Sequence, residues 1–194
     1  MKNAIGEAAV QEKKTIGFWI YLMTDCLLFA SLFATFAVLR GNTFGGPGGD
    51  ELFDLPFVLL ETMVLLTSSF TVGLAILGSV RGYKKQTLIW LVATFLLGAF
   101  FLGLELFEFS QLIAEGNGWQ RSGFLSSYFT LVGTHGLHIA IGLLWLAVMI
   151  YRLWRYKFKK TDIHRLALFG LFWHFLDVVW IFIFSIVYLI GGMA

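Results

Sequence analysis

The 194-residue chain is 58% hydrophobic and only 13% charged, and its mean hydropathy is +0.80. Soluble globular domains carry roughly 25% charged residues, so this composition excludes an ordinary soluble enzyme and indicates a protein dissolved in lipid. The single cysteine, Cys26, excludes a disulfide framework. The net charge is only +2, and we expect no nucleic-acid partner.

Five apolar runs are long enough to cross a membrane, since a hydrocarbon core of ~30 Å takes ~20 helical residues. They cover residues 16–39, 56–80, 88–109, 128–151 and 169–190. The ~10-residue alternating segments of a membrane β-barrel are missing from the sequence. We therefore predict an all-α integral membrane bundle of five transmembrane helices that forms one domain, residues 1–194.

Basic residues predict how the helices are oriented, because cytoplasmic loops carry an excess of Lys and Arg. The first segment, the loop after the second helix and the loop after the fourth helix hold most of them: Lys2, Lys13, Lys14, Arg81, Lys84, Lys85, Arg152, Arg155, Lys157, Lys159, Lys160 and Arg165. The opposite side receives only Arg40 and Arg121. We predict a cytoplasmic N-terminus, a C-terminus outside, and a glycine-rich outer loop at 41–49.

Several titratable side chains fall inside the predicted spans, where a charge costs about 2.5–3.5 kcal/mol on insertion scales. They are Asp25, Glu61, Glu105, Glu108, His135, His138, His174 and Asp177. Each is expected to face the bundle interior or a partner subunit. Counting from the helix ends, the three glutamates and His135 could meet in one polar layer toward the outer face.

The spacing of these residues leaves two interpretations open. Glu105 with Glu108, His135 with His138, and His174 with Asp177 are i, i+3 pairs that each share a helix face. A di-iron site wants Glu-x-x-His on each of two helices, whereas here the acids and imidazoles are segregated, so we favour a structural polar network over a metal site. Glycines on the same faces, Gly98 and Gly142, predict close helix packing.

A haem bound between His138 and His174 is the other metal hypothesis. His138 lies ~15 Å below the outer end of its helix and His174 ~7 Å from the inner end of the last one. In a ~30 Å core the two are ~8 Å apart along the membrane normal, and axial nitrogens at ~2 Å from the iron need only ~4 Å. We expect no catalytic, cofactor-binding or metal-ligating residue in this chain.

Asp25 lies ~14 Å from the inner end of the first helix, near the membrane midplane. One reading is a buried acid that fixes helix contacts. The other is a carboxyl that handles protons, since acids inside the membrane are candidates for proton relays. The sequence leaves both open.

Five segments resemble one family. The segment 173–180, Trp-His-Phe-Leu-Asp-Val-Val-Trp, is similar to the last-helix signature of haem–copper oxidase subunit III, and 133–138, Gly-Thr-His-Gly-Leu-His, is similar to its His-Gly-x-His motif. Segments 17–26 and 121–125 resemble the cytochrome o ubiquinol oxidase branch, and 55–62 agrees with it. The resemblance covers nearly the whole chain.

The resemblance implies the short, five-helix form of a non-redox subunit in the bacterial inner membrane, part of a proton-translocating, oxygen-reducing respiratory complex. The haems and copper would belong to the large subunit I, with subunits II and IV as further partners. It also implies bound phospholipids, and it places Asp25 at the position of an acid linked to proton uptake and enzyme longevity. That acid is commonly glutamate in the cytochrome c branch.

Three alternatives remain at this point. The same subunit of a cytochrome c oxidase would look alike, because the donor site lies in other subunits. A small transporter or lipid-handling membrane protein would also suit acids inside the membrane, although transporters of that kind usually show repeats and broken helices. A metal-dependent membrane enzyme is the third alternative, and metal analysis of the purified chain decides it.

Overall fold

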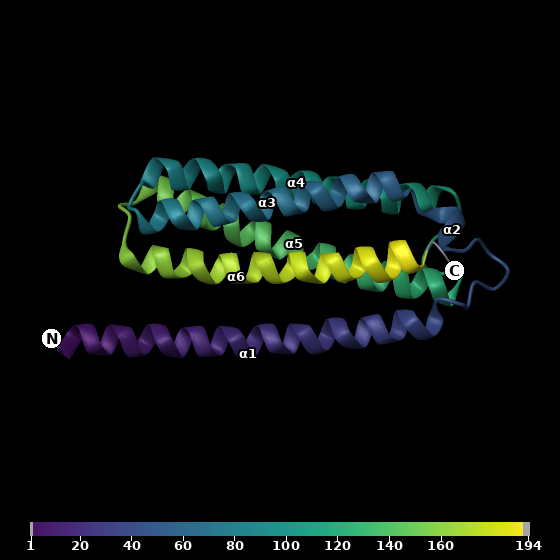
Figure 1. Cartoon of the computed structure of the whole chain (residues 1–194), viewed down its shortest axis with the longest axis horizontal. Helices are drawn as coiled ribbons and strands as arrows, with labels where there is room; N and C mark the ends of the chain where they lie inside the picture. The colour runs from purple at the N-terminus through teal and green to yellow at the C-terminus, as the bar shows by residue number, and fades with distance from the viewer. Residues whose placement is uncertain (1, 192–194) are drawn as a thin grey trace.

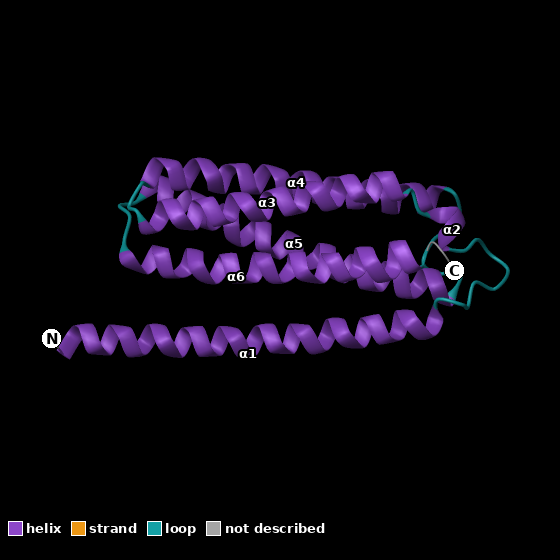
Figure 2. Ribbon diagram, in the orientation of Figure 1, coloured by secondary structure: helices purple, strands orange, loops and turns teal. Residues whose placement is uncertain are grey.

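The computed structural model describes the backbone of residues 2–191 and the side chains of residues 11–49, 52–159 and 161–191. Within that range the chain is helical, with no strand (Figure 2). The helices are α1 (Lys2–Leu39), α2 (Gly49–Leu52), α3 (Leu55–Val80), α4 (Lys84–Ala114), α5 (Gly123–Arg155) and α6 (Lys160–Ile183), and α6 continues as a π-helix over Phe184–Ile190.

The predicted class, an all-helical membrane bundle, is confirmed. Five helices are long and apolar enough to cross a membrane: Gln11–Leu39, Leu55–Val80, Lys84–Ala114, Gly123–Arg155 and Thr161–Ile190. They match the five predicted spans in number and order. The short α2 was not predicted and lies next to the glycine-rich loop.

The predicted spans were too short at most ends. The helices that contain the spans 16–39, 88–109, 128–151 and 169–190 each continue into polar sequence. Hydropathy identifies only the residues that suit the lipid core, whereas the backbone conformation decides where a helix ends. Gly82 and Gly116, at φ +77° and +81°, lie just before α4 begins and just after it ends. At the start of α5, the Ser122 hydroxyl accepts a hydrogen bond from the Leu125 amide at 3.1 Å, a usual way to cap a helix.

Figure 1 shows the long helices side by side, with the N-terminus at one end of the bundle and the C-terminus at the other. The helices α3 and α4 pack against each other, α5 and α6 pack against this pair, and α1 flanks the bundle through contacts with α5 and α6. The turns 81–83 and 156–159 lie at the N-terminal end, which we call the basic end. The loops 40–48 and 115–122 lie at the opposite end (Figures 1 and 2).

The bundle interior is aromatic. Trp173, Trp180, Phe101 and Tyr128 are at most 1% exposed, and Phe101 meets the Trp180 ring edge-on with the ring centroids 4.8 Å apart. Many large apolar side chains cover the outside instead, as expected where the solvent is lipid. With lipid tails outside, apolar burial gives little drive for helices to associate, so close packing and buried polar contacts must hold the bundle together.

Candidate functional site: polar groups buried between the helices

Three glutamates gather in the half of the bundle that lies away from the basic end. Glu105 and Glu108 lie on α4, and Glu61 on α3 is close enough to interact electrostatically with both. Tyr188 donates a hydrogen bond to Glu108 Oε2 at 3.0 Å, and its hydroxyl lies 3.0 Å from that of Tyr128. The cluster thus joins α3, α4, α5 and the π-helix after α6.

Two of these glutamates are buried without a hydrogen bond. Within the described part of the chain, neither carboxyl oxygen of Glu61 nor of Glu105 has a hydrogen-bond partner. Gly136 on α5 makes room for the Glu105 carboxyl, because a Cβ at that position would lie 2.6 Å from Glu105 Oε1. The carboxyl is therefore pressed against the backbone of the neighbouring helix.

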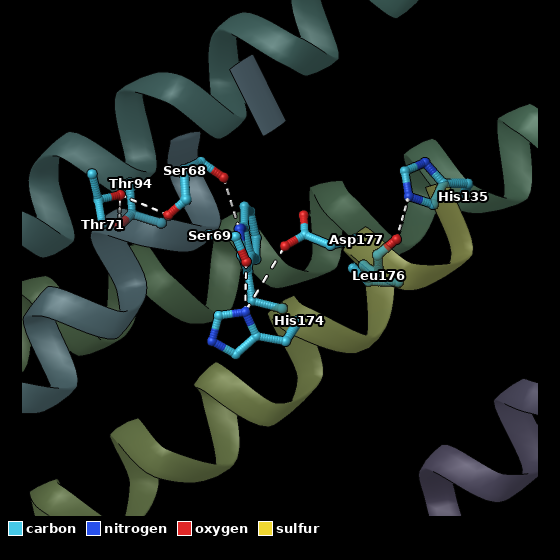
Figure 3. A network of polar contacts seen from close by, with 9 residues as sticks. Ser68, Ser69, Thr71, Thr94, His135, His174, Leu176 and Asp177 are labelled. Atoms are coloured by element: carbon cyan, nitrogen blue, oxygen red, sulfur yellow. Dashed lines mark hydrogen bonds and ion pairs between the residues drawn. The ribbon is translucent and has the colours of Figure 1, made fainter. Parts of the chain in front are cut away.

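His135 does not bond to these glutamates, although the sequence predicted that it could share their layer. Its Nε2 lies 3.3 Å from the carbonyl oxygen of Leu176 on α6 (Figure 3). The ring packs between aromatic neighbours, with centroids 5.1 Å from Trp180 and 5.9 Å from Phe101. Its Nδ1 is buried and has no hydrogen-bond partner in the described residues. His135 therefore links α5 to α6.

His138 reaches in another direction, toward α1. Its Nε2 lies 3.7 Å from Asp25 Oδ1, and its Nδ1 lies 2.8 Å from the carbonyl oxygen of Thr134. Phe29 covers the pair, with its ring centroid 5.3 Å from the imidazole. Both side chains are nearly buried, at 12% and 9% exposure. Asp25 is thus paired with an imidazole from α5, a contact that the sequence reasoning missed.

The third histidine, His174 on α6, faces α3. Its Nδ1 lies 2.6 Å from the Ser69 hydroxyl and 3.9 Å from Asp177 Oδ2, as Figure 3 shows. Asp177 is buried, whereas the imidazole is 49% exposed. The predicted i, i+3 pair is in contact, and Ser69 extends it to a neighbouring helix.

Hydroxyl groups of α3 make further contacts that the sequence reasoning did not find. Ser68 accepts a hydrogen bond from the Trp173 indole at 2.9 Å, and Thr62 accepts one from Trp180 at 3.0 Å. Thr71 lies 2.8 Å from the Thr94 hydroxyl of α4 (Figure 3). Their spacing gave no usable signal, because Thr62 and Ser69 share a face of the helix whereas Thr71 lies on the opposite side.

This arrangement connects helices and brings together no ligand set. The three histidines point to three different partners, on α6, α1 and α3, so no two of them face each other as axial ligands would. Among the residues that the structure describes, no group of three or more His, Cys, Asp and Glu side chains is placed to hold a metal ion. The geometry suits interhelical hydrogen bonding.

Known proteins resemble the chain along nearly its whole length. A family model described as cytochrome c oxidase subunit III matches residues 3–192. The chain is 56% identical over 177 residues to a Pseudomonas aeruginosa protein named cytochrome bo(3) ubiquinol oxidase subunit 3. The aligned residues cover 91% of this chain and 85% of that protein. It is 45% identical to quinol oxidase subunit 3 of Bacillus subtilis, with 91% of this chain and 86% of that protein covered.

A third relative, cytochrome c oxidase subunit 3 of Bacillus sp. strain PS3, is also 45% identical, over 93% of this chain and 87% of that protein. The resemblance inferred from the motifs in the first, second, fourth and fifth long helices is confirmed by these matches. The range matched by the family model, residues 3–192, includes all five long helices. The chain belongs to the cytochrome c oxidase subunit III family.

Proposed function

We propose that this chain is the non-redox subunit III of a proton-translocating, oxygen-reducing ubiquinol oxidase, where it supports assembly and stability of the catalytic subunit. The observation that carries the proposal is the 56% identity, over 91% of the chain, to a protein named as subunit 3 of such an oxidase. The enzyme is an oxidoreductase, and this chain contributes no catalytic residue to it. A small transporter or lipid-handling protein is disfavoured by the family match over residues 3–192.

Ubiquinol is the proposed electron donor of the complex, with cytochrome c as the alternative. At 45% identity the relatives carry both kinds of name, among them a quinol oxidase and a cytochrome c oxidase. The relatives at 56% identity, from two Pseudomonas species, are both named ubiquinol oxidase subunits. The higher identity therefore supports quinol.

Partner contacts are proposed from the polar group that the bundle leaves uncovered. The imidazole of His174 is half exposed on a helix that crosses the membrane, where lipid tails offer no hydrogen bond. We place a partner helix, in the haem- and copper-bearing subunit I, against this part of the α3–α6 face. Subunits II and IV complete the proposed complex.

Asp25 carries the proposed link to proton supply. It is buried on α1 and its only ionic partner in the described residues is His138, at 3.7 Å. Among the residues that the structure describes, its Oδ2 has no hydrogen-bond partner, so the carboxyl retains a site there for a proton or a proton donor. The same contact also fixes α1 to α5, so the Asp25–His138 pair is proposed to have both a structural role and a role in proton supply.

The proposed location is the bacterial inner membrane, with the basic end of the bundle in the cytoplasm. Lys84, Lys85, Arg152 and Arg155 lie at this end, together with the N-terminal segment, and the positive-inside rule assigns such an end to the cytoplasm. Bound phospholipids are proposed as the only non-protein ligands of the chain.

Purification of a tagged chain from its native membrane tests the proposal. We expect a large haem-bearing subunit to co-purify, the preparation to oxidise quinol faster than cytochrome c, and the separated chain to contain neither haem nor copper. Preferential oxidation of cytochrome c would replace the donor assignment. Stoichiometric metal in the separated chain, or the absence of any haem from the preparation, would refute the proposed role.

A further inference from the structure

An apolar groove lies on the outside of the bundle between α4 and α5, near the basic end. It has a volume of about 480 Å³, within the ~300–1,000 Å³ range of small-molecule sites. One wall is Leu88, Val92 and Phe95 of α4, and the other is formed by α5 from Ala147 to Trp154. The polar network described above does not reach this groove.

The groove ends inside the membrane because the helices converge there. At Gly98, one turn past Phe95, a Cβ would lie 3.0 Å from Leu143 Cδ2 of α5. From Leu88 to Phe95 the groove therefore runs ~10 Å at 1.5 Å per residue. This length is about two thirds of a single leaflet, which is half of a ~30 Å core. The groove matches the upper part of an acyl chain and is too short to seat a helix that crosses the whole bilayer.

The open mouth of the groove is basic. Lys84 and Lys85 precede Leu88 by about one turn of α4, and Lys84 Nζ donates a hydrogen bond across the mouth to the carbonyl oxygen of Tyr156, at 2.8 Å. Arg155 is exposed beside Trp154. The nearby acid of this end, Asp162, is already paired with Arg152 at 3.2 Å.

Aromatic side chains mark the depth of this mouth. Trp154 and Tyr151 are both exposed, at 69% and 59%, and Trp and Tyr concentrate at the level of lipid headgroups. Lysines at this level and an acyl-length apolar groove below them form the two halves of a site for one amphipathic molecule. A basic side chain near an anionic lipid surface contributes ~1 kcal/mol.

We propose that this groove binds one anionic phospholipid, with its phosphate at Lys84 and Lys85 and an acyl chain between α4 and α5. Only the choice of leaflet rests on the membrane orientation proposed above, which places the lipid in the cytoplasmic leaflet. It names the site and the headgroup charge of a bound lipid, which membership of the family does not supply.

Photo-crosslinking in the assembled oxidase tests the site. The complex is placed in nanodiscs doped with phosphatidylglycerol or phosphatidylcholine, each carrying the same diazirine acyl chain, and crosslinked peptides are mapped by mass spectrometry. We expect crosslinks in peptides 88–95 and 147–154, with phosphatidylglycerol preferred. Equal labelling by both lipids would overturn the headgroup claim, and absence of label from both peptides would overturn the groove.

Matched variants separate headgroup from groove. Lys84→Gln with Lys85→Gln should lower the preference for phosphatidylglycerol roughly 30-fold, which corresponds to two charges at ~1 kcal/mol each. The control pair, Lys13→Gln with Lys14→Gln, removes two exposed charges from the same end on α1 and should leave the preference unchanged. Equal loss in both pairs would show general attraction to the surface and overturn the site.

The second variant fills the groove. Ala147→Trp should abolish labelling by either lipid at both peptides, whereas Ala99→Trp, at an exposed position outside the groove, should not. Persistence of the label in Ala147→Trp would overturn the proposal. The haem spectrum and subunit content of each sample report separately whether the oxidase has assembled, so failure of the proposed function remains distinguishable from failure of the lipid site.

Discussion

Trp173 occupies the centre of the bundle, and a single methyl group opposite it should test how tightly the helices are packed. Its indole lies between two glycines of neighbouring helices. A Cβ on Gly98 of α4 would be 2.9 Å from Trp173 Cη2, and one on Gly142 of α5 would be 3.0 Å from Cζ3. The indole nitrogen is held by Ser68 of α3 at 2.9 Å. One side chain of α6 therefore contacts three other helices.

Gly98→Ala is expected to destabilise the bundle because the ring has no free direction in which to move. Overpacking of a filled core costs about 1–3 kcal/mol. Alanine also gains about 0.5–1 kcal/mol over glycine within a helix, and this gain must be subtracted. Gly103→Ala supplies the correction, since Gly103 lies on the same helix with nothing within 4 Å of the added Cβ. The difference between the two variants isolates the packing cost.

The assay is the temperature at which half of the chain is lost from the purified oxidase. For a chain of this size each kcal/mol of destabilisation lowers the midpoint temperature by about 2–4 °C. The midpoint of Gly98→Ala should therefore lie roughly 2–12 °C below that of Gly103→Ala. Trp173→Phe removes part of the ring that the added methyl group would meet. It should therefore lose less stability in the Gly98→Ala background than in the wild type, and this difference, the coupling energy, should be about 0.5–3 kcal/mol. Equal midpoints for the two alanine variants, with no coupling, would refute the close packing inferred here.

Three further predictions concern the polar contacts. Thr62→Val keeps the shape of the side chain but leaves the Trp180 indole unpaired, so it should lower stability by about 1–3 kcal/mol in the same midpoint assay. Thr67→Val is the control, because the Thr67 hydroxyl bonds to its own helix at Met63, and it should shift the midpoint little. Asp177→Leu should lower the yield of assembled oxidase more than the turnover of what assembles, as measured by haem content and quinol oxidation; normal assembly without turnover would point to chemistry. Asp25→Asn should assemble and retain substantial initial activity but decay faster during turnover at high pH, where protons are scarce; identical decay at every pH would leave Asp25 a structural contact only.

The number and order of the helices could be predicted because crossing lipid requires ~20 apolar residues in a row, and this requirement is visible in the sequence. Helix ends could not be placed in the same way. The helix α4 continues from Lys84 to Ala114, well beyond the apolar run, because lysine and glutamine are good helix formers that hydropathy discounts. Backbone features at Gly82 and Gly116 decide the ends instead.

The pairing of Asp25 with His138 was within reach of the sequence. From the inner side Asp25 is ~14 Å deep and from the outer side His138 is ~15 Å deep, so both lie at the midplane of a ~30 Å core. Depth alone allowed the contact that the structure places at 3.7 Å. What depth cannot supply is which helices are neighbours, and here α1 packs on α5 and α6.

The hydroxyl contacts of α3 were beyond sequence reasoning for a different reason. A serine or threonine in a helix can always bond to its own backbone, and Thr71 does so with the Ser68 carbonyl at 2.6 Å while it also reaches Thr94. The sequence therefore gives no sign of which hydroxyl is used between helices. That choice depends on the rotation of α3 about its axis, which is set by packing against the indoles of Trp173 and Trp180.

The same packing explains why a chain proposed to hold no redox centre has so many buried polar groups. Lipid removes most of the hydrophobic drive for helices to associate, and hydrogen bonds across a helix interface are directional where apolar contacts are not. Along α6, Trp173 and Trp180 donate to α3, and His174 contacts the same helix through Ser69. These three contacts span two turns and fix both the rotation and the height of α6 against α3. A subunit proposed to act by its shape needs that register, because the partner helix proposed above packs against the surface that α3 and α6 form together.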